Sequence, residues 1–316
     1  MEYRRLGNSG VKVSAISLGA WLTYGSDGVE DDTAATCIRT AIEHGVNFID
    51  VADIYSRGEA EKVVGKVIKD YKRSDLVVST KAFWPMSDNV NDRGLSRKHL
   101  FEAVENSLKR FDMDYVDIFF CHRYDNETPT EETVRAISDL MQQGKILYWG
   151  TSMWSAANIE EAVGIADRAN TYRPTTEQPI YNMLVRDQVE GEVEAICDKY
   201  GIGLVVWSPL AGGVLTGKYN DGVPDGSRGA TSNWLDRILN DDNIEKVRQL
   251  TNLAGEMGTT MPALALAWAM KNKVVSSVIT GATKPAQVDK NMKALEVVIT
   301  EEINKKIESI LDNKPE

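Results

Sequence analysis

The chain has 316 residues, 42% of them hydrophobic and 26% charged, with a formal net charge of -11. This composition is typical of a globular protein with a sizeable core, and the acidic balance argues against general nucleic-acid binding, which requires a basic face. No apolar run reaches the length of a membrane span, and the first ten residues contain no signal-peptide core. The three cysteines, Cys37, Cys121 and Cys197, are widely spaced and predict no disulfide framework, so we expect a cytoplasmic protein.

Short apolar runs alternate with helical patterns along the chain. The runs are rich in β-branched and aromatic residues and lack strict alternation, which is typical of strands covered on both faces in a parallel sheet. They cover residues 13–20, 47–52, 76–82, 116–121, 146–152, 175–181, 203–208 and 274–280. The patterns between and after them predict helices over 31–45, 58–70, 96–111, 130–143, 155–169, 187–200, 243–257 and 284–295. Ser96 is the expected N-cap of its helix, whereas Thr130 and Thr133 compete for that role in theirs.

Eight strand–helix units predict an α/β fold that closes into a (β/α)8 TIM barrel, with a doubly wound sheet as the rival arrangement. Residues 4–13 predict an N-terminal hairpin that turns at Asn8-Ser9-Gly10 and covers the bottom of the barrel. An extra C-terminal helix is expected over 300–312, beginning at Thr300. The segment 211–242 is too long for an ordinary connection, and such loops are usually functional. Without a repeat or a linker, residues 1–316 are expected to form a single domain.

Unusual polar residues stand at the ends of these strands, where barrel enzymes place their catalytic groups. Asp50 ends the second run, Tyr55 follows five positions later, Lys81 ends the third run and His122 the fourth. Tyr55 can act as a general acid toward a carbonyl oxygen, although a free phenol, with a pKa of about 10, is a weak one. We expect the Lys81 cation to lower the pKa of Tyr55, Asp50 to keep Lys81 charged, and His122 to orient the carbonyl.

Each of these residues also has an ordinary structural interpretation. Asp50 and Lys81 can form a structural ion pair, Tyr55 can pack with its hydroxyl satisfied, and His122 can be a core histidine. A metal site is not expected, because the adjacent Cys121 and His122 point to opposite faces of a strand and no ligand pair has metal spacing. The functional interpretation depends on the four residues occurring together at matching strand ends.

The whole chain, from about residue 3 to residue 315, resembles the aldo-keto reductase family, in particular the branch of potassium-channel β-subunits and their microbial and plant enzyme relatives. The resemblance is carried by "GVNFIDVADIYSRGEAEKVVG", "VVSTKAFW", "RGLSRKHLFEAVENSLKR", "YVDIFFCHRYD", "TPTEETVRA", "YWGTSMWS", "WSPLAGGVLTGKY" and "SSVITGATKPAQV". It implies a catalytic tetrad of Asp50, Tyr55, Lys81 and His122, with Tyr55 as the proton donor. It also implies small aldehydes or reactive ketones as substrates.

The resemblance further implies NADPH (or NADP+) bound across the C-terminal face of the barrel. Ser152 and Gln178 would hold the carboxamide, the stretch 207–212 would line the pyrophosphate, and Lys218 and Arg228 would meet the 2′-phosphate. The implied cofactor residues are Trp21, Asp50, Ser152, Gln178, Trp207, Ser208, Pro209, Leu210, Ala211, Gly212, Lys218, Arg228, Gly281, Ala282, Thr283, Gln287 and Asn291. Lys290 departs from the acidic residue expected in channel-type relatives, and we hypothesise that it sharpens a preference for NADPH.

The substrate pocket is expected to contain Trp21, Tyr55, Trp84 and His122, with Tyr124, Trp154 and Trp234 as further aromatic candidates. Arg57 or Arg123 could attract an acidic or phosphorylated aldehyde. The near P-loop "GGVLTGKY" lacks the Ser or Thr that would hold magnesium, so nucleotide hydrolysis is not expected.

Two functions stay open at this point. The first is an NADPH-dependent carbonyl reductase, and the alternative is a cofactor-sensing protein like the channel β-subunits. His122 favours the enzyme, since the channel-type relatives are expected to carry asparagine there. Relatives of this branch also imply a homo-oligomer, by analogy a tetramer.

Overall fold

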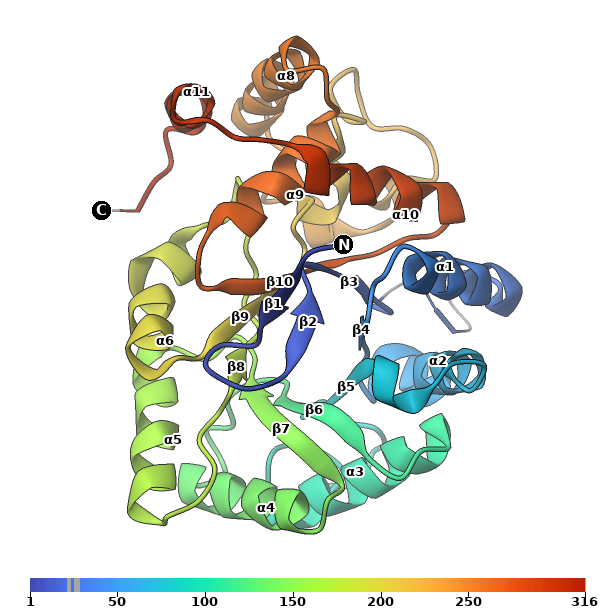
Figure 1. Ribbon diagram of the computed structural model, residues 1–316, viewed down its shortest axis with the longest axis vertical. Helices are drawn as coiled ribbons and strands as arrows, with labels where there is room; N and C mark the ends of the chain where they lie inside the picture. The colour runs from blue at the N-terminus through green and yellow to red at the C-terminus, as the bar shows by residue number, and fades with distance from the viewer. Residues whose placement is uncertain (22–23, 26–28, 316) are drawn as a thin grey trace.

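Eight parallel strands close into a barrel in the computed structural model, which describes residues 1–21, 24–25 and 29–315. Figure 1 shows the helices arranged around it. The neighbours run in the order β10-β3-β4-β5-β6-β7-β8-β9, so each strand pairs with the next and the last pairs with the first. The strands are β3 (Ile16–Gly19), β4 (Phe48–Asp50), β5 (Val77–Ala82), β6 (Val116–Cys121), β7 (Ile146–Thr151), β8 (Thr176–Glu177), β9 (Gly203–Val206) and β10 (Val275–Thr280). The predicted (β/α)8 barrel is confirmed.

Helices follow the strands at nearly all the predicted places. They are α1 (Asp31–Glu43), α2 (Glu59–Ile68), α3 (Arg97–Phe111), α4 (Thr130–Gln142), α5 (Ala156–Arg168), α6 (Glu194–Tyr200), α7 (Arg228–Thr231), α8 (Asp241–Glu256), α9 (Met261–Lys271), α10 (Pro285–Met292) and α11 (Glu301–Leu311). Ser96 caps α3 by accepting a hydrogen bond from His99 N, and Thr300 caps α11 as predicted. Neither Thr130 nor Thr133 caps α4, whose N-cap is Pro129, because the chain already turns helical at Thr130.

The sequence patterns missed the short helix α7 and the longer helix α9, and merged two strands. Helix α9 is apolar on all sides and almost wholly buried, so it has no polar face for a helical period to reveal. The run 13–20 is divided between hairpin strand β2 (Lys12–Ser14) and barrel strand β3, because Ala15 interrupts the pairing. None of the helices in the described part of the chain combines the length and apolar character needed to span a bilayer.

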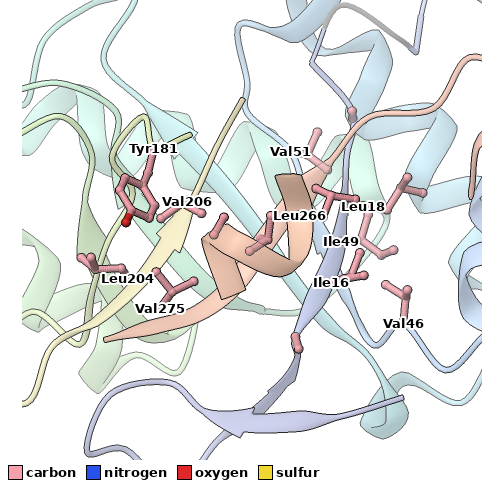
Figure 2. Packing of buried hydrophobic residues seen from close by; sticks show 14 of the residues in the cluster. Ile16, Leu18, Val46, Ile49, Val51, Tyr181, Leu204, Val206, Leu266 and Val275 are labelled. Carbon is pink, nitrogen blue, oxygen red and sulfur yellow. The ribbon is translucent and has the colours of Figure 1, made fainter. Parts of the chain in front are cut away.

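Two hydrophobic clusters lie on opposite sides of the barrel wall, and residues of strands such as β6 alternate between them. The larger one lies between the strands and the surrounding helices and includes Ile16, Ile49 and Val206, as Figure 2 shows. The smaller one fills the inside of the barrel with Phe48, Ile118 and Phe120.

The predicted hairpin of β1 (Tyr3–Arg5) and β2 covers one end of the barrel (Figure 1). Leu6 and Val13, at its two sides, are fully buried in the inner cluster. The hairpin therefore closes the bottom, and the inner space opens only toward the carboxyl ends of the strands.

Candidate active site

The alternation of the strands decides which way each candidate residue points. On β6, Phe119 and Cys121 belong to the outer cluster, whereas Ile118 and Phe120 belong to the inner one. His122 is the next position on the inward face, directly above Phe120. The same period of two places Asp50 inward above Phe48, and Lys81 inward above Ser79 and Val77. Three of the four predicted catalytic residues thus share the inner side of the barrel at its C-terminal end.

Asp50 and Lys81 form a buried ion pair that is fully hydrogen-bonded. Lys81 Nζ lies 2.7 Å from Asp50 Oδ2 and donates a second bond of 2.6 Å to the carbonyl of Val51. Asp50 Oδ1 accepts bonds of 2.7 Å from Ser79 Oγ and 2.9 Å from Gln178 Nε2. Burial lowers the pKa of Lys81, and the Asp50 carboxylate opposes that change. A buried charge pair is tolerable only when both partners are satisfied in this way.

The hydroxyl of Tyr55 lies 3.4 Å from Lys81 Nζ and so extends the ion pair toward the barrel mouth. Tyr55 begins a short 3-10 helix (Tyr55–Gly58) in which Ser56 and Arg57 adopt left-handed backbone angles, with φ of 47° and 51°. Such angles are costly for non-glycine residues and concentrate at functional sites.

The expected lowering of the pKa of Tyr55 is wrong. Burial raises the pKa of Tyr55 well above its usual value, and the negative charge of Asp50 adds to the rise. The positive charge of Arg123 opposes it. The prediction failed because it weighed the Lys81 cation without the desolvation of the phenol and without the anion that accompanies Lys81.

His122 completes the group. Its ring lies edge-on to Tyr55, with 5.9 Å between the ring centroids, and edge-on to Trp84 at 6.3 Å. Burial and the nearby Lys81 and Arg123 charges hold the pKa of His122 well below its usual value, so the imidazole is neutral at pH 7. Its Nδ1 is enclosed without a partner among the described residues, whereas Nε2 is not enclosed. A neutral imidazole donates from one ring nitrogen only, and the open side is the one that a substrate can reach.

Ser152 and Gln178 lie next to this group. Ser152 Oγ donates a bond of 2.9 Å to the carbonyl of Gln178, and both side chains are buried. Gln178 reaches across the barrel to Asp50, so the predicted carboxamide site and the predicted catalytic residues form one hydrogen-bond network.

The loop after β9 brings three tryptophans together. Trp21 packs edge-on against Trp207 and Trp234, with centroid distances of 5.6 and 5.5 Å, and the Arg228 guanidinium lies 5.9 Å from the Trp21 ring. Trp234 comes from the long segment 211–242, which therefore folds back over the mouth. Trp154, by contrast, is buried against Tyr124 at 4.9 Å, which assigns both residues a packing role.

The remaining predicted cofactor residues lie along this loop and at the start of α10. Ser208, Ala211, Gly212 and Gly213 all have positive φ, so the backbone makes a strained turn right after β9. On the other side, Gln287 Oε1 accepts bonds from Thr283 N and Oγ1, Ala282 and Asn291 are buried, and Gly281 and Lys290 are exposed. Within the described part of the chain this second group forms no hydrogen bond or ring contact with Tyr55 or His122, so the two groups occupy different parts of the mouth.

The residues present fit a bound nicotinamide dinucleotide. Arg228 is half-buried and Lys218 is exposed, and neither forms an ion pair with any residue in the described part of the chain. A side chain at Gly212 would come within 2.6 Å of Leu235 and 2.7 Å of Trp234, so only glycine leaves the turn open there. Two uncompensated cations beside a strained glycine turn are suited to phosphate oxygens.

Sequence reasoning missed two contributors to this site. Ser79 anchors Asp50, and the signal was available, because Ser79 stands two positions before Lys81 on the same face and in register with Asp50. Asn182 Nδ2 holds the carbonyl of Ser208 at 3.0 Å, a long-range contact that no local pattern announces.

Other parts of the surface do not compete with this site. Two surface cavities of about 560 and 620 Å³ lie beside α3 and between α8 and α11, and none of the predicted site residues lines either of them. Among the residues that the structure describes, no group of three or more His, Cys, Asp or Glu side chains is placed to hold a metal ion.

Comparison with known proteins gives one consistent result. The model of the Aldo/keto reductase family matches residues 15–312. Similar curated proteins include a "Probable voltage-gated potassium channel subunit beta" from Arabidopsis thaliana, 48% identical over 100% of this chain and 98% of the relative. Proteins of the same description from Oryza sativa subsp. japonica (47%, 98% of the relative) and, as "Putative", from Schizosaccharomyces pombe (46%, 94%) also match over 100% of this chain. Members of the matched family are oxidoreductases that act on small carbonyl compounds and generally use NAD(P)H. The chain belongs to the aldo/keto reductase family.

Proposed function

We propose that this protein reduces small aldehydes or reactive ketones to alcohols with NADPH. The observation that carries the proposal is the buried series Asp50–Lys81–Tyr55, with the neutral His122 beside the Tyr55 ring at the open end of the barrel. Family membership supports the oxidoreductase class, and the uncompensated Arg228 and Lys218 support a phosphate-bearing cofactor.

The residues divide the chemistry between them. His122 donates a hydrogen bond to the carbonyl oxygen and fixes its position. NADPH, which Ser152, Gln178 and Arg228 would help to hold, would supply the hydride for the carbonyl carbon when bound. Tyr55 gives its hydroxyl proton to the oxygen as negative charge develops there, and the Lys81 ammonium, 3.4 Å away, stabilises the phenolate that is left.

Asp50 contributes by keeping Lys81 charged inside a site that disfavours the charge. The high pKa of Tyr55 makes the phenol a weak acid in isolation, so proton donation depends on the charge that develops on the carbonyl oxygen and on the Lys81 and Arg123 cations that stabilise the phenolate. Asp50 and Lys81 are therefore expected to act through Tyr55.

The test is steady-state loss of NADPH absorbance with a panel of aldehydes and ketones, for the wild type and for Tyr55→Phe. The substitution removes only the acidic hydroxyl and preserves the ring that packs on His122. We expect Tyr55→Phe to lose at least about a hundredfold in kcat/KM, because general acid catalysis contributes about that much or more. NADPH binding, followed by quenching of tryptophan fluorescence, is expected to be unchanged in the variant.

The names of the relatives support a second candidate, a channel β-subunit-like protein that senses cofactor state with little or no turnover. The same assay separates the two. A wild type that binds NADPH but oxidises it no faster than Tyr55→Phe with every carbonyl compound would exclude the reductase and leave the sensing role.

A further inference from the structure

Arg123 is a half-buried cation held at the edge of the candidate site. It directly follows His122, and its Nη1 donates hydrogen bonds to the carbonyl of His122 and, at 3.4 Å, to Ser152 Oγ. Its guanidinium lies 5.6 Å from the centroid of the Trp84 ring. These contacts fix one end of the guanidinium against the barrel rim.

No carboxylate among the residues that the structure describes forms an ion pair with this guanidinium. Three other arginines with largely buried side chains pair with acids: Arg73 with Asp117, Arg110 with Glu61, and Arg186 with Glu190 and Glu308. Arg228, at the proposed cofactor site, is half-buried and, like Arg123, forms no ion pair with a described residue. Arg123 forms no ion pair with any residue in the described ranges 1–21, 24–25 and 29–315. A desolvated cation without a partner is costly, and proteins usually retain one only where a ligand supplies the missing charge.

The carboxyl group whose charge acts on Arg123 does not fill this role. Glu177 lies on β8 and is fully buried, with its oxygens engaged by Thr151 Oγ1 and the backbone of Trp154. Burial raises the pKa of Glu177 to about 7, so it carries only part of a charge at neutral pH. The positive charge of Arg123 is therefore available to pair with an anion that is not part of the protein.

The free donors of Arg123 are open. Its Nε and Nη2 have no hydrogen-bond partner among the described residues, yet they are not among the enclosed unpaired atoms, so they reach the solvent at the mouth. Successive groups from Tyr55 to His122, Trp84 and Arg123 lie 5.9, 6.3 and 5.6 Å apart. The charge of Arg123 also acts on the Tyr55 hydroxyl, so the guanidinium lies near the space in which a carbonyl would meet Tyr55.

Arg57, the other candidate, does not share these features. Its side chain is exposed and forms no hydrogen bond or cation–π contact with the described residues Trp84, His122 and Ser152. It therefore serves as a matched control, since it carries the same charge close to Tyr55 in sequence but has no place in the pocket.

We propose that Arg123 selects carbonyl substrates that carry an anionic group, a carboxylate or a phosphate, a few carbon atoms from the reacting carbonyl. The planar guanidinium fork matches the oxygens of both groups. This inference rests on the proposed reductase function and adds a substrate class to it.

The test compares matched pairs of substrates in the intact protein with NADPH. One pair is succinic semialdehyde and its methyl ester, and the other is glycolaldehyde phosphate and glycolaldehyde. For each pair, the ratio of kcat/KM for the anionic member to that for the neutral member is measured in the wild type, Arg123→Gln, Arg123→Lys and Arg57→Gln. Taking the ratio removes any effect of Arg123 on Tyr55, which both members of a pair share.

We expect Arg123→Gln to lower this ratio about ten- to hundredfold in at least one pair, since that is the usual contribution of a charge-assisted hydrogen bond. Arg123→Lys should lower it less, and Arg57→Gln should leave it within about twofold. The pair with the larger change identifies the anion as a carboxylate or a phosphate. An equal loss on both members of each pair overturns the inference and leaves Arg123 a structural support of the rim, while the reductase function stands.

A binding measurement keeps the inference testable if no carbonyl compound is reduced, an outcome that sinks the reductase proposal itself. Succinate and inorganic phosphate are titrated into the complex with NADP+, with tryptophan fluorescence as the signal, because Trp84 lies beside Arg123. Weaker binding by at least about tenfold in Arg123→Gln supports an anion site. Binding that is absent, or equal in both proteins, overturns it.

Discussion

Glu177 is a carboxyl group buried between the barrel and its helices, and replacing it by glutamine should change how stability depends on pH. Its side chain is wholly enclosed, and it accepts hydrogen bonds from Thr151 Oγ1 and from Trp154 N, the latter at 3.3 Å. Burial is the main reason that the pKa of Glu177 rises from its ordinary value of 4.5 to about 7, and the hydrogen bonds only partly oppose the rise.

The magnitude follows from proton linkage. A raised pKa in the folded state means that the folded protein holds this proton more tightly than the unfolded chain does. The associated stability is fully present below about pH 4.5 and is lost as the pH rises through about 7. Since each tenfold change in proton affinity is worth about 1.4 kcal/mol, charging Glu177 costs the folded state about 3 kcal/mol.

Glutamine can keep the contacts and avoid the charge. Its amide oxygen can accept from Trp154 N, and its amide nitrogen can donate to Thr151 Oγ1. We therefore expect the free energy of unfolding of Glu177→Gln, relative to the wild type, to grow by about 2 to 3 kcal/mol between about pH 5 and about pH 8.

The assay is urea unfolding of both proteins at several pH values, with the difference between them isolating Glu177 from every other titrating group. Glu256→Gln, which replaces an exposed glutamate at the end of α8, is the control and should show a flat difference. If the difference for Glu177→Gln stays flat or grows toward low pH, Glu177 is not a desolvated acid and the reasoning is refuted.

Two further predictions concern the candidate site. His122→Asn should lower kcat/KM for aldehydes at least about tenfold, because the His122 ring lies beside Tyr55 and Trp84. The dissociation constant for NADPH, measured by fluorescence, should stay within about twofold of the wild-type value. An equal loss of cofactor binding would show that the role of His122 is misplaced. Lys290→Glu should reduce the ratio of kcat/KM for NADPH to that for NADH by about threefold or more, because Lys290 on α10 is expected to act on the 2′-phosphate. The expected change is modest because Lys290 is exposed and an exposed charge contributes little. Glu245→Gln on α8 is a surface-charge control, and an unchanged ratio in Lys290→Glu would remove Lys290 from cofactor selection.

The high pKa of Tyr55 changes how the proposed proton transfer is understood. The sequence placed a cation beside the phenol and suggested that the pKa of Tyr55 is lowered, which would make it a stronger acid. In the folded protein, burial and Asp50 hold the proton on Tyr55. The hydroxyl is thus fully protonated at neutral pH, and the positive charges of Lys81 and Arg123 matter mainly after the proton has left. The pH dependence of kcat/KM is consequently expected to show no titration of Tyr55 near neutrality.

The sequence by itself determined the barrel and the identity of its polar rim. Parallel strands of a barrel end at one edge, so the strand positions of Asp50, Lys81 and His122 predict that they meet at the C-terminal rim. The alternation of side chains along a strand separated His122 from its neighbour Cys121 and removed the suggestion of a metal site. Strand positions and the alternation of side chains depend on neighbouring residues, so the local sequence pattern predicts them.

Only the tertiary structure decided the features that depend on what surrounds a residue. Helix α9 escaped prediction because burial on every side leaves no periodic contrast in its sequence. The pKa of Tyr55 and of Glu177 depends on how far each group is removed from water, which no spacing reveals. Arg110 pairs with Glu61, whereas Arg123 forms no ion pair with a described residue, and ion pairing between distant parts of the chain is settled only when the chain folds.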